Sequence, residues 1–138
     1  MDGEGSIFQI RRARKSDMQV LLQLIAAIFP SARRRTKPGD IFLLAERGSV
    51  PVGFCHMRLD EEKKRCYIAG LGVLAHYREH GIGRRLMYEA VLFADKMGVE
   101  TTTLKVRALN TASKLYLDFG FFERRAGDTL TLVRKKPS

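Results

Sequence analysis

The stretch from residue 71 to residue 84 constrains this chain most, because a strand pattern changes there into a helix pattern across two glycines. The apolar run that ends at Val73 has the length of a strand. After it, apolar residues recur every three or four positions through residue 97, which indicates an amphipathic helix. Gly81 and Gly83 stand at the start of that helix. The chain therefore passes from a strand into a helix through a short turn that contains glycine.

Such a turn is suited to binding phosphate groups. The first turn of a helix presents unpaired backbone N–H groups and the positive end of the helix dipole. Glycine lets a phosphate approach that backbone closely, and two flanking arginines add positive charge. The sequence therefore predicts a pyrophosphate cradle, formed by Arg78, Glu79, His80, Gly81, Ile82, Gly83 and Arg84.

Three phosphate-binding patterns compete for this turn. A P-loop needs G-x-x-x-x-G-K-[ST], and no such lysine follows these glycines. A Rossmann fingerprint needs a third glycine where Leu86 stands. Residues 78–83 do fit the pattern R/Q-x-x-G-x-G/A. On this motif alone, a glycine-containing turn that merely caps the helix is the alternative.

The remaining chain alternates between strand and helix patterns without strict order. Strand patterns occupy residues 8–12, 41–45, 52–59, 66–73, 101–106, 121–124 and 129–133, and helical patterns occupy residues 18–29, 82–97 and 110–119. The order β-α-β-β-β-α-β-α-β-β predicts a mixed sheet. A length of 138 residues predicts a single domain over residues 1–138.

Three motifs in this order resemble those of the GNAT superfamily of N-acetyltransferases. Leu71-x-Val73 precedes the phosphate motif, L-x-V-R follows at residues 104–107, and L-Y-x-x-x-G-F follows at residues 115–121. The last two look most like the acetyltransferases of ribosomal-protein N-termini. The resemblance implies an α/β (α+β) fold with a mixed, mostly antiparallel sheet of six to seven strands. The sheet is expected to splay between strands 4 and 5 and to be flanked by helices.

The resemblance also implies a cofactor and a reaction. Acetyl-CoA would be the co-substrate, without a metal, and its acetyl group would move to a primary amine by direct attack in a ternary complex. The amine could belong to a protein N-terminus, a lysine or a small molecule. The bulged segment Leu71, Gly72 and Val73 would bind the pantetheine arm, the backbone from Glu79 to Arg84 would bind the pyrophosphate, and Tyr116 would lie near the thioester sulfur.

Amide formation requires three chemical contributions. The N–H of Val73 could stabilise the developing oxyanion, and the protonated phenol of Tyr116 could protonate the departing thiolate. The amine must also lose a proton, but no carboxylate can be carried over, because Ala69 and Gly70 stand where many relatives have Glu. His56 is the candidate base, and proton loss through water is equally compatible with the sequence.

The segment before the last helix departs from the family pattern. Relatives place Asn seven residues before the tyrosine, whereas here Leu109 has that position and Asn110 stands six residues before Tyr116. Asn110 and Ser113 are nevertheless expected to contact the cofactor. Capping of the helix by Asn110 is the alternative.

Composition narrows the remaining function classes. No apolar stretch is long enough to span a membrane, and no secretory signal is visible, so a cytoplasmic protein is expected. Cys55 and Cys66 are expected to be reduced and buried.

The net charge of +10 attracts anions, so contact with a ribosome stays open, although no nucleic-acid reader motif occurs. A non-catalytic module that binds acyl-CoA is a further alternative, and a homodimer is left open.

Overall fold

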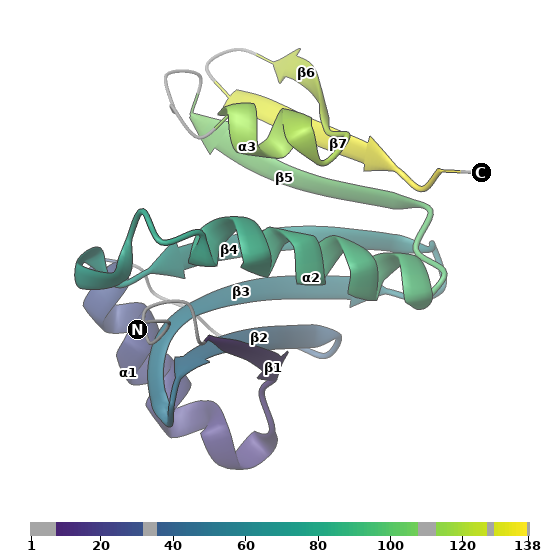
Figure 1. Cartoon of the computed structure of the whole chain (residues 1–138). Helices are drawn as coiled ribbons and strands as arrows, with labels where there is room; N and C mark the ends of the chain where they lie inside the picture. The colour runs from purple at the N-terminus through teal and green to yellow at the C-terminus, as the bar shows by residue number, and fades with distance from the viewer. Residues whose placement is uncertain (1–7, 32–35, 108–112, 127–128, 138) are drawn as a thin grey trace.

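The chain folds around one mixed sheet that carries helices on both faces (Figure 1). The computed structural model describes residues 8–31, 36–107, 113–126 and 129–137. The strands are β1 (Gln9–Arg12), β2 (Asp40–Arg47), β3 (Val50–Asp60), β4 (Arg65–Val73), β5 (Thr101–Arg107), β6 (Phe122–Ala126) and β7 (Thr129–Lys135). The helices are α1 (Met18–Ile28), α2 (Ile82–Lys96) and α3 (Ser113–Asp118), with 3₁₀ turns at Lys15–Asp17 and Ala75–Tyr77. The predicted order and the predicted mixed sheet are confirmed.

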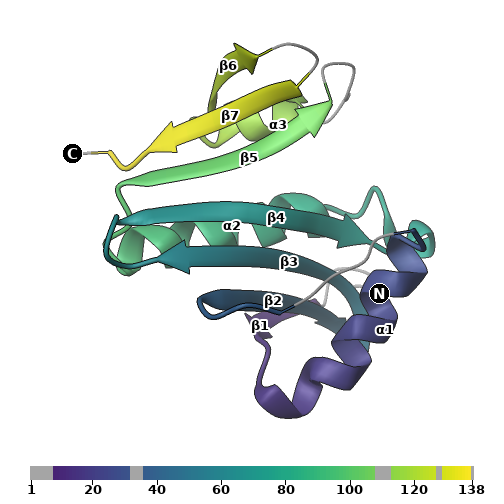
Figure 2. The same ribbon diagram turned by 180° about the vertical axis from the view of Figure 1, so that it is seen from behind.

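The described strands lie in the order β1-β2-β3-β4-β5-β7-β6. All neighbouring strands are antiparallel except β4 and β5, which are parallel. Residues 65–68 of β4 pair with residues 101–104 of β5, and the ladder extends no further in the described part of the chain. Figures 1 and 2 show the two strands diverging beyond that point. The predicted splay between strands 4 and 5 is therefore present, and we call this opening the split.

Each face of the sheet packs against helices through its own set of buried side chains. On one face, Leu21, Leu24 and Ile25 of α1 pack against alternate residues of β2 and β3. On the other face, α2 and α3 contribute Leu86, Met87, Ala90 and Tyr116. Each fully buried leucine or phenylalanine side chain contributes roughly 1.5–3 kcal/mol to stability. The two layers hold β4 between α1 and α2, so they position the strand that borders the split.

The exposed side of α1 differs from the sequence expectation. The helical spacing groups Leu22 with the apolar residues of this helix, yet its side chain is 44% exposed. The buried side chains of α1 are Leu21, Leu24 and Ile25. Leu22 lies about 100° around the helix from Leu21, at the flank of this buried face. None of the described helices is long and apolar enough to cross a membrane.

Both cysteines are buried and unbridged, as expected. Burial raises the pKa of the Cys66 thiol to about 12, with a smaller opposing contribution from a backbone hydrogen bond at Arg58. Burial likewise raises the pKa of Cys55. The two thiols are therefore neutral at physiological pH and act as packing groups.

Candidate active site

A β-bulge in β4 sets up the strand edge that borders the split. The β3–β4 register pairs His56 with Gly70 and Met57 with Ile68, so Ala69 is the additional residue on β4. A bulge of this kind bends the strand and increases its local twist. The bend begins directly after Ile68, the last residue of β4 that pairs with β5. The bulge therefore lies where the two strands part.

Beyond the bulge, the backbone groups of Leu71 and Val73 face the split. In an antiparallel pair, consecutive residues alternately direct their N–H and C=O groups toward the partner strand and away from it. The N–H of Leu74 donates to the Val52 carbonyl of β3 at 2.9 Å, so Gly72 also faces β3. Leu71 and Val73 lie between these positions and face away from β3. An extended, amide-bearing group could add to this edge in the manner of a further strand.

Gly72 serves the packing of α1 and does not contribute backbone groups to the split. A Cβ atom at this position would lie 2.8 Å from Cγ2 of Ile28 and 2.8 Å from Cε2 of Phe29. Any side chain at residue 72 would therefore collide with the end of α1. The absence of a side chain at Gly72 is thus explained by packing, and its assignment to the cofactor-binding residues stays a prediction.

The turn into α2 leaves its first backbone N–H groups accessible. Glu79 and Gly81 have positive φ angles of 65° and 81°. Gly81 is the N-cap of α2 and provides no side-chain hydrogen bond. A Cβ atom at Gly81 would meet nothing within 4 Å, and one at Gly83 would meet only Cγ2 of Val73, at 3.9 Å. The cradle is thus open on its glycine side, and its first turn lies close to the end of β4.

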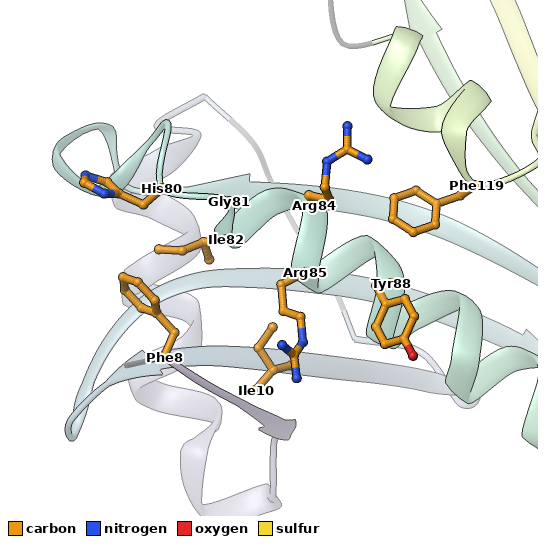
Figure 3. A pocket seen from close by; sticks show the side chains of 9 residues that line it. All are labelled: Phe8, Ile10, His80, Gly81, Ile82, Arg84, Arg85, Tyr88 and Phe119. Atoms are coloured by element: carbon orange, nitrogen blue, oxygen red, sulfur yellow. The ribbon is translucent and has the colours of Figure 1, made fainter. Parts of the chain in front are cut away.

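Two arginines flank this cradle and already have partners. Nε of Arg78 donates to the Val73 carbonyl at 3.1 Å, which ties the turn to the edge of β4. Nη2 of Arg84 donates to Oδ2 of Asp118 at 2.9 Å. Its guanidinium group also lies 5.8 Å from the centre of the Phe119 ring (Figure 3). Such an exposed ion pair is weak, so a phosphate could take Asp118's place on Arg84.

A cavity of about 620 Å³ opens beside the first turns of α2 (Figure 3). This volume lies within the range of small-molecule sites. The cavity contains part of the cradle together with side chains from the residue before β1, from β1 and α2, and from the residue after α3. It is lined by Phe8, Ile10, His80, Gly81, Ile82, Arg84, Arg85, Tyr88 and Phe119. The sequence did not indicate Phe8, Tyr88 or Phe119 as site residues, because no motif connects these distant positions.

Tyr116 of α3 packs on the α2 face of the sheet and is only 8% exposed. Its ring makes an edge contact with Phe121, with the ring centres 6.3 Å apart. Burial raises the pKa of Tyr116, and the nearby Cys55 raises it further, so the phenol is protonated at neutral pH. Cys55 is the β3 residue opposite Leu71. Tyr116 therefore reaches the sheet near the edge that borders the split.

His56 lies on the opposite face of the sheet from Tyr116. Its ring stacks on Phe42, with the ring centres 4.2 Å apart, and it is 2% exposed. Nε2 of His56 is 3.2 Å from Oδ1 of Asp40, which also accepts a hydrogen bond from Nε of Arg58 at 2.9 Å. Burial raises the pKa of Asp40, but hydrogen bonds from Arg58, the Lys37 N–H and His56 outweigh it and keep that pKa below its usual range. The structure thus places His56 beside a buried carboxylate.

The two remaining predicted site residues are only partly covered by the structure. Asn110 lies outside the described residues. Ser113 is described as the first residue of α3 and no further. Lys105, within the L-x-V-R motif, is exposed on β5. Among the residues that the structure describes, no group of three or more His, Cys, Asp or Glu side chains could hold a metal ion.

Comparisons with known proteins show which family and which fold the chain resembles. The model of the acetyltransferase (GNAT) family matches residues 8–121. N-alpha-acetyltransferase 50 of Danio rerio is 34% identical over 87 residues, which cover 60% of this chain and 52% of that protein. The chain spans about half the length of the curated relatives it matches.

Two solved structures share the fold at low sequence identity. The Escherichia coli ribosomal-protein-S18-alanine N-acetyltransferase has a TM-score of 0.80 at 17% identity, and the match covers 94% of both chains. Arabidopsis thaliana Naa50, solved in complex with the bisubstrate analogue CoA-Ac-MVNAL, has a TM-score of 0.80 at 23% identity. That match covers 94% of this chain and 99% of the other.

Proposed function

The chain belongs to the GNAT family of acetyltransferases, and from that membership we propose that it transfers the acetyl group of acetyl-CoA to a primary amine. The observation that carries the proposal is the arrangement around the split. The outward edge of Leu71 and Val73 ends directly at the open N-terminus of α2, where Val73 approaches Gly83. One ligand with an amide-bearing arm and linked phosphates fits both features. We further propose that residues 1–138 act as a single domain.

The backbone at the split would bind and orient the cofactor. Acetyl-CoA, when bound, supplies a thioester whose carbonyl carbon accepts the amine. The edge at Leu71 and Val73 would pair with amides of the pantetheine arm, and the first N–H groups of α2 would hold the pyrophosphate. The N–H of Val73, which faces the split, would donate a hydrogen bond to the thioester carbonyl oxygen as that oxygen gains negative charge. All three contributions come from the backbone, so they depend on the fold more than on side-chain identity.

Tyr116 would supply the proton that the departing thiolate needs. Its burial keeps the phenol protonated well above neutral pH. It approaches the sheet near Cys55 and Leu71, beside the position where the thioester would lie. General acids of this kind typically contribute about 100-fold to 10,000-fold in rate.

The amine would lose its proton either to His56 or through water. His56 faces the side of the sheet opposite to Tyr116 and is 2% exposed, so an amine would reach it only through an intervening water molecule. Asp40 would fix the ring orientation of His56. The base role of His56 stays a prediction.

We propose that the acceptor is the α-amino group of a protein or peptide. The relatives named above include N-alpha-acetyltransferases, and one solved neighbour carries a peptide-containing bisubstrate analogue. The chemistry of the site supports the same choice. An α-amino group has a pKa of about 7.7–8.0, against about 10.4 for lysine, so a large fraction is neutral near physiological pH. Such an acceptor needs no strong base, and Ala69 and Gly70 provide none.

A thiol-release assay with matched acceptors tests this proposal. The purified chain is incubated with acetyl-CoA and a panel of peptides with a free N-terminus. Controls are the same peptides with a blocked N-terminus and an internal lysine, and a small amine. We expect free CoA and an acetylated N-terminus with at least one free peptide. Binding of CoA without thiol release from any acceptor would instead identify a non-catalytic module.

A further inference from the structure

A single buried arginine joins three elements behind the split. Nε of Arg134, on β7, donates to the Phe119 carbonyl at 2.9 Å. Its Nη1 and Nη2 atoms donate to Oδ1 and Oδ2 of Asp95 at 2.9 and 3.1 Å. The Arg134 side chain is only 9% exposed and that of Asp95 is 26% exposed. The arginine thus connects β7, the end of α3 and the last turns of α2.

This connection spans the two halves of the molecule that border the split. The Val73 edge and the cradle belong to the half that contains β4 and α2, whereas Tyr116 belongs to the half that contains β5, α3, β6 and β7 (Figure 1). The only strand pairing between these halves in the described residues covers positions 65–68 and 101–104. The placement of Tyr116 relative to Val73 therefore depends on further contacts between the halves.

Arg134 acts directly on the segment that carries Tyr116. Phe119, whose carbonyl accepts from Arg134, donates its own N–H to the Tyr116 carbonyl at 3.0 Å. The N–H of Phe121 also donates to the Tyr116 carbonyl, at 3.2 Å. A displacement of Phe119 would therefore move Tyr116. A bidentate arginine–carboxylate pair has a fixed planar geometry, so it is suited to holding this segment in one position.

The ion pair between Arg84 of α2 and Asp118 of α3 cannot serve in the same way. Arg84 and Asp118 are 54% and 40% exposed, so water and salt weaken their interaction. Arg84 also borders the cradle. A phosphate there would compete with Asp118, whereas Arg134 is shielded from that competition.

We propose that Arg134, held by Asp95, is a positioning residue that fixes Tyr116 across the split from the Val73 N–H. This inference rests on the proposed acetyl transfer and on the role of Tyr116 as proton donor. It predicts that Arg134 affects the rate of transfer far more than the binding of CoA, because the cradle and the β4 edge lie on the other half.

The substitutions Arg134→Lys and Asp95→Asn test this inference. Lysine keeps the charge, but its ammonium group lacks the planar fork with which arginine binds Asp95 and the Phe119 carbonyl together. Because small misplacements of catalytic groups cost up to about 100-fold, we expect kcat to fall about 10-fold to 100-fold. The dissociation constant of CoA is expected to change by less than about threefold, since the backbone groups that bind CoA are not altered by these substitutions. Lys135→Gln, at the exposed next residue, is the control and should leave both quantities unchanged.

A double-mutant cycle with Tyr116→Phe separates positioning from general destabilisation. If Arg134 acts through Tyr116, Arg134→Lys should slow the wild type but add little to the loss in Tyr116→Phe. Equal fold losses in both backgrounds would overturn the inference, as would an unchanged kcat in Arg134→Lys. Asp95→Asn gives the same comparison if Arg134→Lys does not fold.

The same measurements distinguish this inference from the proposed function. No turnover by the wild type with any amine would remove the proposed function and the inference together. Normal turnover by Tyr116→Phe would remove the proton-donor role, and the inference with it. A slow Tyr116→Phe variant beside a fully active Arg134→Lys variant would overturn the inference alone.

Discussion

Replacement of Gly81 by alanine should affect stability and CoA binding through two separate causes. Gly81 has φ 81° and ψ 7°, in the left-handed region. An L-residue in that region costs roughly 1–2 kcal/mol. The added methyl group meets no other atom within 4 Å, so no clash adds to this cost. The free energy of unfolding should therefore fall by about 1–2 kcal/mol.

The loss of CoA affinity in Gly81→Ala should be larger than the change in the free energy of unfolding suggests. Gly81 lines the cavity beside α2, so the methyl group would occupy the open side of the cradle. A hydrogen bond to a charged group is worth about 1.5–3 kcal/mol. Loss of one such bond between the helix N-terminus and a phosphate raises the dissociation constant about 10-fold to 150-fold. Urea denaturation measures the first effect, and isothermal titration calorimetry with CoA measures the second.

Gly81→Asn is the matched variant that separates the two causes. Asparagine tolerates the left-handed conformation better than alanine, so it should destabilise the fold less. Its larger side chain should weaken CoA binding at least as much. Recovery of CoA affinity in Gly81→Asn would show that backbone strain alone caused the loss. An unchanged affinity in both variants would refute the assignment of the phosphates to this turn.

Further outcomes follow from the structure. Gly72→Ala should lower the free energy of unfolding by about 1–3 kcal/mol, measured in urea, because the new methyl group would lie 2.8 Å from the side chains of Ile28 and Phe29. Tyr116→Phe should lower kcat by about 100-fold or more without weakening CoA binding. In the wild type, the raised pKa of Tyr116 predicts no loss of rate from this phenol up to about pH 10. Asp118→Asn should free Arg84 and tighten CoA binding about twofold to fivefold at low salt, and the gain should vanish at high salt. Cys66, whose pKa is raised from 9.0 to about 12, should resist iodoacetamide until the chain unfolds. The contribution of its buried neutral thiol to the free energy of unfolding is fully present below pH 9.0 and is lost as the pH rises toward 12.

The fold and the backbone part of the site could be predicted because they depend on local patterns. Periodicity gave the order of strands and helices, and the glycines at 81 and 83 marked the open start of α2. The motif resemblance added the splay between β4 and β5, which periodicity alone does not show. The close packing of the end of α1 against Gly72 is a tertiary contact that the motifs do not indicate.

Long-range side-chain pairs could not be predicted from the sequence. Arg134 lies in a basic cluster of the sequence and reads as a surface residue, yet it is buried against Asp95, 39 residues away. Arg11 likewise belongs to a basic cluster, but it bonds to Asp17 and Glu46. Partner choice of this kind depends on the tertiary fold, and only a folded structure brings the partners together.

The central claim is that backbone N–H groups at the split and at the start of α2 bind CoA. An amide titration by ¹H–¹⁵N NMR tests it most directly, because it reports each N–H separately. Addition of CoA should shift the amide signals of Leu71, Val73 and residues 82–84 strongly and slow their hydrogen exchange. If those signals stay in place while CoA binds elsewhere, the assignment of this site is wrong.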